Sequence, residues 1–269
     1  MLKKNPEILL FCSFKKVKQL FSKLEDLFQS YNYMKSIIKK LLLGNVSKIQ
    51  KPKLNPVRRR IQNIKSIWNN DHQDDNGIEK IVRLFLSSSQ LFFPGIYIKY
   101  LACKKGYEYQ DIALDFYILL KVAFPLLILV NQWQNNGFVI WIMLYVLLET
   151  VLYIPTLIFA SDLFSKPRSY KRSMLLLFLN YIEIVFAFGV LYSCDSYLNK
   201  PFANWFDAIY FSTITSSSIG YGDFYPVTTI GKMLVSTQAL LFLFFVVLFL
   251  NFFSTKIKAK GYFDLENED

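Results

Sequence analysis

Residues that build metal centres and disulfide frameworks are scarce in this chain. Its 269 residues include one histidine, His72, and three cysteines that lie far apart, Cys12, Cys103 and Cys194. A zinc or haem site needs several ligands, and a disulfide framework needs paired cysteines. A catalytic triad and a nucleotide-binding glycine pattern are also missing. The sequence therefore predicts no metal cluster and no cofactor, and we do not expect an enzyme.

Acidic residues are few in the first part of the chain, and charge of either sign is rare in the second. Residues 1–110 contain 21 Lys and Arg against 8 Asp and Glu, whereas residues 111–269 contain 10 against 12. The chain is 53% hydrophobic and includes 26 phenylalanines, more than a soluble domain of this length usually needs. This asymmetry predicts a basic cytoplasmic region joined to a membrane domain.

Four apolar segments reach the length of a membrane-spanning helix, which is about 20 residues. They are Ile112–Asn131, Gly137–Ala160, Ser173–Cys194 and Gly231–Ser254. Basic residues gather in the connector Ser161–Arg172 and after the last segment. Because positive charge stays on the cytoplasmic side, both termini are expected inside a multi-pass protein of the cell membrane. The predicted fold class is an all-α membrane protein with four transmembrane helices.

The basic region, residues 1–110, leaves alternatives open. Ile81–Cys103 is fairly apolar, but as a fifth span it would place the basic N-terminal part outside, so we expect an interfacial or protein-buried hairpin. Residues 7–43 show apolar residues at helical spacing among lysines, which suits either an anionic lipid surface or a small helical bundle. The basic run at residues 53–60 lacks a nucleic-acid reading motif, so no nucleic-acid partner is expected.

A half-length apolar segment and a glycine-containing loop lie between the third and fourth apolar segments. Trp205–Ser217 would form a helix of roughly 20 Å, at about 1.5 Å per residue, which reaches only part-way across a bilayer. The loop after it reads Ser218-Ile219-Gly220-Tyr221-Gly222-Asp223. Non-helical backbone at membrane depth persists only where it is buried in protein or lines water. The sequence therefore predicts a re-entrant pore helix followed by a loop.

This arrangement resembles the pore module of the potassium channel family, whose filter reads Thr-Val-Gly-Tyr-Gly. The flanking runs Asp207–Phe211 and Tyr225–Thr228 are also similar to the family, and the resemblance covers about Ser173–Ser254. It implies a homotetramer in which rings of carbonyl oxygens replace the hydration shell of potassium, the permeant ligand. The implied carbonyls are those of Ser218, Ile219, Gly220 and Tyr221.

The resemblance also assigns roles around this filter. Gly220 and Gly222 reach positive φ without strain, which lets successive carbonyls face one axis. The side chains of Ile219 and Tyr221 would pack behind the filter. Asp223 would lie at the outer mouth, with Tyr210 or a backbone donor as its partner, and raise the local cation concentration.

Several positions depart from the family pattern. Ser218 replaces the usual threonine and lacks its methyl group, so the inner ion site is expected to be looser. Ile214 stands where some members have an acid. The last apolar segment has no hinge glycine between Lys232 and Ser254 and is rich in phenylalanine. Its candidates to line the pore are Gln238, Phe242 and Asn251.

Three ionisable residues fall near the middle of the first three spans: Lys121, Glu149 and Glu183. A charge at bilayer depth costs at least about 2.5–3.5 kcal/mol unless it is paired. We therefore expect Lys121 to pair with Glu149 or Glu183. Such a pair either fixes helix packing or couples the spans during gating. A voltage sensor would need several basic residues at three-residue spacing, and Lys121 stands alone.

These features divide the chain into four parts. A basic helical region, 1–110, precedes a two-span hairpin with its connector, 111–172; a pore domain, 173–255, precedes a short tail, 256–269. The predicted function is passive potassium transport through a homotetrameric, potassium-selective channel. Membrane lipids are expected as further partners, with anionic lipids among the candidates. The alternatives are a weakly selective cation channel and a non-conducting membrane sensor or adaptor.

Overall fold

The computed structural model describes residues 55–71, 76–160 and 170–254, together with Ser30, Tyr33, Met34 and Ile37. Side chains are described as far as Leu250. Within these residues the chain is helical between its loops, and the only extended pairing is an isolated bridge of Leu198 with Pro226. This confirms the predicted all-α fold class. Most of residues 7–43 and the tail 256–269 lie outside the described residues.

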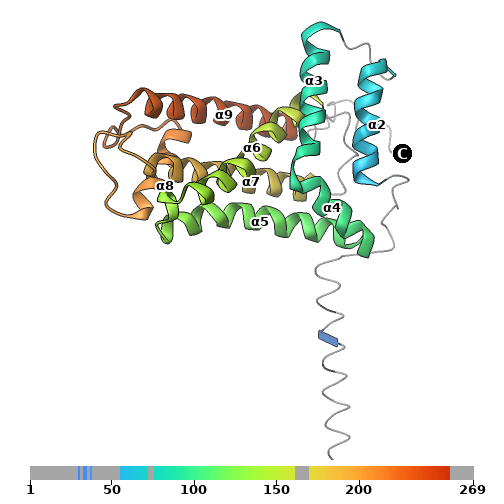
Figure 1. Ribbon diagram of the computed structural model, residues 1–269, viewed down its shortest axis with the longest axis horizontal. Coiled ribbons are helices and arrows are strands. Elements are labelled where there is room, and N and C mark those ends of the chain that lie inside the picture. Colours follow the sequence, from blue (N-terminus) through green and yellow to red (C-terminus); the bar gives the residue numbers. More distant parts are fainter. Residues whose placement is uncertain are drawn as a thin grey trace, which may run out of the picture.

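Four helices are long and apolar enough to cross a membrane, and each overlaps one predicted segment. They are α5 (Tyr109–Val130), α6 (Gly137–Phe159), α7 (Tyr170–Ser193) and α9 (Thr229–Ser254). In Figure 1, α5, α7 and α9 follow a common direction, and α6 runs obliquely beside them. These helices form the multi-pass membrane part of the molecule.

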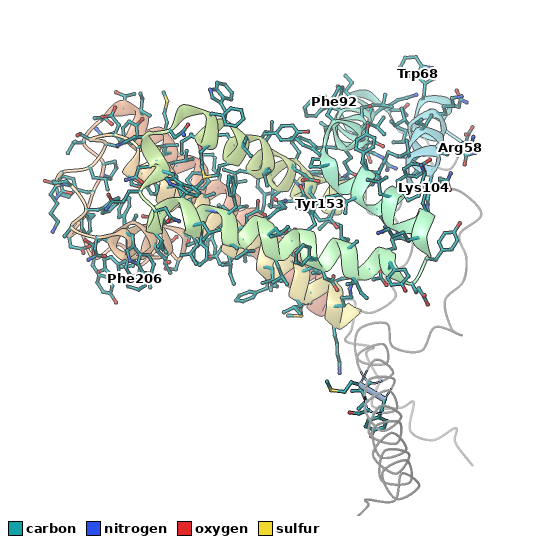
Figure 2. All side chains as sticks on the ribbon, turned by 60° about the horizontal axis from the view of Figure 1, so that its bottom comes forward. Arg58, Trp68, Phe92, Lys104, Tyr153 and Phe206 are labelled. Atoms are coloured by element: carbon teal, nitrogen blue, oxygen red, sulfur yellow. The ribbon has the colours of Figure 1, made fainter. Side chains whose placement is uncertain are left out.

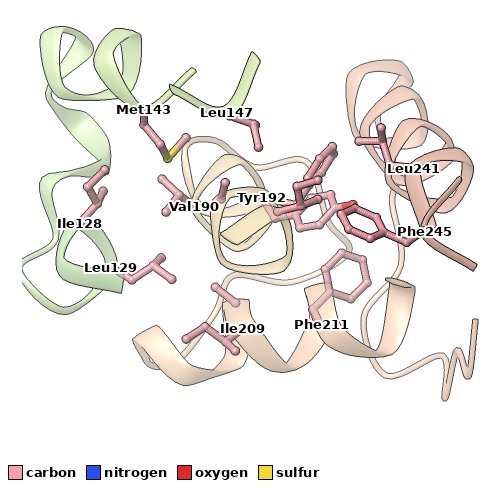
Figure 3. Packing of buried hydrophobic residues seen from close by; sticks show 14 of the residues in the cluster. Ile128, Leu129, Met143, Leu147, Val190, Tyr192, Ile209, Phe211, Leu241 and Phe245 are labelled. Carbon is pink, nitrogen blue, oxygen red and sulfur yellow. The ribbon is translucent and has the colours of Figure 1, made fainter. Parts of the chain in front are cut away.

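The central helix of this bundle is α7, which packs against α5, α6, α9 and the short helix α8 (Trp205–Ser216). Figure 3 shows buried apolar side chains of all five helices meeting around it, among them Ile128, Met143, Val190, Tyr192, Phe211 and Phe245. Large apolar side chains on the outward faces stay exposed, including Phe116, Leu120, Phe138 and Trp141. An apolar bilayer around the bundle accounts for this exposure.

A polar cluster at one end of the bundle fixes α7 to α5. The Arg172 guanidinium lies 3.3 Å from Asp111 Oδ1 and 2.5 Å from Asp115 Oδ1. Its Nη2 also donates to the Asp111 carbonyl oxygen at 2.8 Å. Because Asp111 and Asp115 are one helical turn apart, a single arginine can bind both carboxylates.

Three further helices lie at the end of the bundle opposite α8 (Figure 1). They are α2 (Pro56–Asn69), α3 (Gly77–Ser89) and α4 (Pro94–Lys105), with the 3-10 turn η2 (Gln90–Phe92) between the last two. Phe93 is extended and Pro94 begins α4, so the chain bends by 59° between α3–η2 and α4. The predicted hairpin Ile81–Cys103 is thus a broken helix pair.

Candidate functional site

The helix that leads into the loop, α8, begins in a complete capping box. Asn204 Oδ1 accepts the N–H groups of Phe206 and Asp207 at 2.8 and 3.1 Å, and Asp207 Oδ2 accepts the Asn204 N–H at 3.2 Å. These bonds satisfy N–H groups that an α-helix leaves free at its start. Sequence reasoning missed Asn204, although an asparagine three residues before an aspartate is a recognisable signal.

The opposite end of α8 closes in a Schellman motif. The Ile219 N–H donates to the Ile214 carbonyl at 3.1 Å, and the Ser218 N–H donates to the Thr215 carbonyl at 3.2 Å. Ser218 has φ 58°, in the left-handed region that this motif requires. The helix therefore ends at Ser216, one residue before the predicted Ser217, which forms the C-cap.

Positive φ recurs at every second residue of the loop. Ser218, Gly220 and Gly222 have φ values of 58°, 57° and 81°. Such alternation changes the orientation of successive peptide planes, so carbonyl oxygens can face one side, which a regular strand does not allow. The glycine spacing predicted this conformation at two of the three positions. At Ser218 it follows from the end of the helix rather than from the residue type.

The loop itself is uncovered in the single chain. Ser217 to Asp223 are all exposed, and the side chains of Ile219 and Tyr221 are 56% and 71% exposed. The Asp223 carboxylate lies beside the Tyr210 side chain, one of the two partners expected for it. The chain therefore anchors the end of the loop and leaves its middle open to a neighbouring molecule.

Asn199, in the segment after α7, holds the backbone that follows the loop. Its N–H donates to the Tyr225 carbonyl at 3.0 Å, and its Oδ1 accepts the Tyr225 N–H at 3.0 Å. Its Nδ2 also reaches the Asp223 carbonyl at 3.4 Å. Sequence reasoning missed Asn199, because nothing in its local sequence indicates a partner 26 residues away.

Gln238 corrects a prediction. We expected it to line the pore, but only 1% of the residue is exposed even in the single chain. Its Oε1 accepts the Tyr192 hydroxyl at 2.7 Å, and its Nε2 donates to the Ser212 carbonyl at 3.0 Å and to Ser212 Oγ at 2.8 Å. Ser212 Oγ in turn donates to the Val185 carbonyl at 2.6 Å. Gln238 thus joins α7, α8 and α9.

Phe242 and Asn251 are the other two residues that were expected to line the pore. Phe242 is half-buried, and its ring centroid lies 6.1 Å from that of Tyr181 on α7, so this ring faces the chain's own outer helix. The side chain of Asn251 lies outside the described residues. The exposed face of α9 carries Leu240, Leu243, Val247 and Leu250 instead.

Two close contacts between α7 and α8 hold the pore helix in place. A Cβ added to Gly189 would lie 3.2 Å from the Ala208 carbonyl oxygen, so the two backbones approach closely where a side chain would interfere. Near the other end of α8, the Tyr181 hydroxyl donates to Ser216 Oγ at 3.0 Å. The residues before the loop are therefore positioned mainly by the helix that precedes them in sequence.

The three mid-span charges come together between α5, α6 and α7. Lys121 Nζ lies 3.3 Å from Glu183 Oε2 and 3.8 Å from Glu149 Oε2. Thr150 also lies in the cluster: its Oγ1 accepts from Lys121 Nζ and donates to Glu183 Oε2 at 2.8 Å. Lys121 and Glu183 are 6% and 1% exposed. One ammonium group is thus shared by both carboxylates.

Glu149 also connects this charged cluster to the broken helix pair. Its Oε1 accepts the Gly95 N–H at 3.1 Å, and its Oε2 accepts from the Tyr117 hydroxyl. A Cβ at Gly95 would lie 2.5 Å from Glu149 Oε1, so a larger residue here would force the Glu149 carboxylate to shift. Sequence reasoning assigned no role to Gly95.

Cys194 lies just past the end of α7 and is half-buried. Its Sγ is 3.3 Å from the Val190 carbonyl oxygen, to which it donates. Burial, and secondarily the Asp195 carboxylate, raises the pKa of this thiol above its usual value. A thiol in this state is a poor nucleophile and metal ligand, in agreement with a structural role.

Comparison with known proteins finds similarity in the region that contains the loop. Residues 180–259 match a family model described as an ion channel. A hyperpolarization-activated voltage-gated potassium channel of Methanocaldococcus jannaschii is 35% identical over 74 residues, 27% of this chain and 35% of that protein. The pore region of this chain is therefore similar to part of this potassium channel.

A second relative of this pore region is the human potassium voltage-gated channel subfamily KQT member 4. It is 32% identical over 71 residues, which is 26% of this chain and 10% of that protein. The chain therefore matches about a third of the length of one relative and a tenth of the other. No solved structure shows significant similarity to this chain. The channel match points to a transport protein rather than an enzyme.

Proposed function

We propose that this protein is a potassium-selective channel that conducts passively through a homotetrameric pore. One observation carries the proposal: a half-length helix between two membrane-length helices ends in a loop with positive φ at Ser218, Gly220 and Gly222. The carbonyls of Ser218, Ile219, Gly220 and Tyr221 would bind the ion in place of water. The names of the relatives support potassium as that ion.

The tetramer follows from the single loop in each chain. Within the described residues, one chain supplies a single row of carbonyl oxygens. A potassium ion needs oxygens on all sides. Four copies around an axis form a closed ring of identical contacts. The exposed side chains of Ile219 and Tyr221 would then be covered by neighbouring copies.

The direction of α8 supports a cation as the permeant ion. With the loop facing outside, α8 runs inward, and its C-terminal end carries partial negative charge near the cavity. This orientation also puts the basic connector 161–172 on the cytoplasmic side, with both termini inside. Asp223 at the outer mouth would add a negative charge where cations enter.

Planar-bilayer recordings of the purified chain in mixed potassium and sodium test the proposal. We expect a reversal potential near that of potassium and complete loss of current in Gly220→Asp, measured at equal membrane insertion. Current that persists in Gly220→Asp would contradict the pore assignment. Complete absence of current from correctly assembled wild-type protein would favour the non-conducting sensor or adaptor.

Ser218 favours one alternative, a weakly selective cation channel. Threonine, the usual residue at this position in the family, carries a methyl group that serine lacks, so the hydroxyl ring of the inner site would be held less firmly. The same recordings decide between the two functions. A reversal potential midway between those of potassium and sodium that shifts toward potassium in Ser218→Thr would establish the weakly selective channel.

A further inference from the structure

The exposed face of α3 is apolar. Ile78, Ile81 and Phe85 are 81%, 68% and 60% exposed, and their spacing of three and four residues places them on one side of the helix. Phe92, in the η2 turn that continues α3, is 75% exposed. Figure 2 shows Phe92 at the surface of the end of the molecule formed by α2, α3 and α4. We call these four residues the α3 apolar face.

Of the four buried residues of the same helix, three are polar and one, Leu86 at 4% exposure, is apolar. Arg83, Ser87 and Ser89 are 4%, 0% and 8% exposed. A helix at the surface of a water-soluble domain shows the reverse pattern, with apolar residues inward and charged residues outward. Inverted polarity of this kind indicates that the medium outside α3 is less polar than the protein inside.

The neighbouring helix α2 provides an internal comparison. It packs against α3, and most of its exposed side chains are polar: Arg58, Gln62, Lys65 and Asn69, beside the apolar Ile61 and Trp68 at 42% and 69%, whereas Ile67 is 3% exposed. This is the ordinary pattern of a helix in contact with water. The exposed surface of α2 is thus mainly polar and that of α3 mainly apolar, which places the boundary between the two media close to these helices.

The position of the break relative to α6 gives the depth of the α3 apolar face. The Phe92 carbonyl accepts the Tyr145 hydroxyl at 2.5 Å, and the Gly95 N–H reaches Glu149 at 3.1 Å. Tyr145 and Glu149 lie in the middle third of α6. The outward residues Trp141, Tyr145 and Leu148 of α6 are 74%, 46% and 48% exposed. The α3 apolar face thus adjoins the lipid-facing surface of a membrane-spanning helix.

We propose that α3 and η2 are embedded in the bilayer and that the α3 apolar face contacts lipid acyl chains, with α2 covering the pair on the aqueous side. This surface is separate from the pore and does not depend on what the pore conducts. It assigns the broken helix pair, whose length and composition alone allow a span or a re-entrant loop, to the membrane. Acyl chains are the occupant because this apolar face adjoins the exposed, lipid-facing surface of α6.

Photocrosslinking of the full chain in vesicles of phosphatidylcholine and phosphatidylglycerol tests this proposal. Phe85 or Ile81 is replaced by the photoreactive residue p-benzoylphenylalanine, and Lys65 on the outward face of α2 receives the same replacement as the matched control. After irradiation, intact-mass measurement should show a protein–phospholipid adduct for positions 85 and 81 and none for position 65.

Two results would overturn the proposal. Covalent protein dimers instead of lipid adducts at positions 85 and 81 would mean that another copy of the chain covers this face. An absence of lipid adducts at both positions, with the yield no higher than at position 65, would mean that the face is exposed to water. Two separate positions guard against the failure of one variant to fold, which is checked by its elution as the wild-type assembly.

Discussion

Gly220 and Gly77 have nearly the same backbone conformation but lie in different parts of the chain. Their φ values are 57° and 58°, and a Cβ at either would meet nothing within 4 Å. In both Gly220→Ala and Gly77→Ala the cost is thus local backbone strain of about 1–2 kcal/mol. We expect Gly220→Ala to abolish selective potassium flux into liposomes and Gly77→Ala to leave it unchanged. Equal flux in the two variants would contradict the role assigned to Gly220.

Gln238 is expected to matter for stability and for the position of the pore helix. Gln238→Leu keeps the approximate volume but leaves Tyr192 and Ser212 with buried polar atoms that lose a partner, at a cost of about 1–3 kcal/mol. Unfolding in detergent measures this loss. The matched control is Thr237→Val, because the Thr237 hydroxyl is exposed and bonds only within its own helix. Equal stability of the two variants would show that the Gln238 network contributes little.

For single residues, the sequence predicted backbone conformation better than it predicted burial. The positive φ of Gly220 and Gly222 was predictable because glycine adopts it without steric cost. The burial of Gln238 was not, because a polar residue in an apolar helix suits a water-filled cavity as well as a buried network. Only the contacts with Tyr192 and Ser212 distinguish these environments.

At the scale of helices, Lys121 is the link between α6 and α7 in the charged cluster. Lys121→Met would leave the Glu149 and Glu183 carboxylates close together without a compensating charge, so we expect a loss of about 3–5 kcal/mol in stability. Adding Glu183→Gln should recover part of it, and the double-mutant cycle measures the coupling. Lys232→Met, on an exposed lysine of α9, is the control. Additive effects of Lys121→Met and Glu183→Gln in this cycle would argue against a shared ion pair.

The bounds of the long helices were predictable to within a few residues because a run of about 20 apolar residues has few alternatives. The break between α3 and α4 was harder to predict from the sequence. Its composition fits an interfacial hairpin, a buried hairpin or a span, and local propensity does not distinguish them. The docking of Gly95 on Glu149 connects residues 54 positions apart, which no local pattern reveals.

At the scale of the whole molecule, the exposed loop predicts the assembly. Ile219, Tyr221 and the outward residues of α9 are uncovered in one chain. We expect native mass spectrometry of the detergent-solubilised protein to give four times the 31.6 kDa chain mass. Subunit counting by single-molecule photobleaching in liposomes provides an independent measurement. A stable monomer or dimer that still conducts would contradict a fourfold pore.

The sequence by itself determined the spans, the re-entrant helix and the glycine-containing loop. Each depends on interactions between residues close in the chain: apolar run length, helix rise and the φ range of glycine. The tertiary structure alone decided which polar groups meet. Lys121 lies between two glutamates, Gln238 faces the pore helix, and α3 turns its polar side inward. These pairings join residues distant in sequence, and a buried polar group is stable only beside a partner that the packing of whole helices supplies.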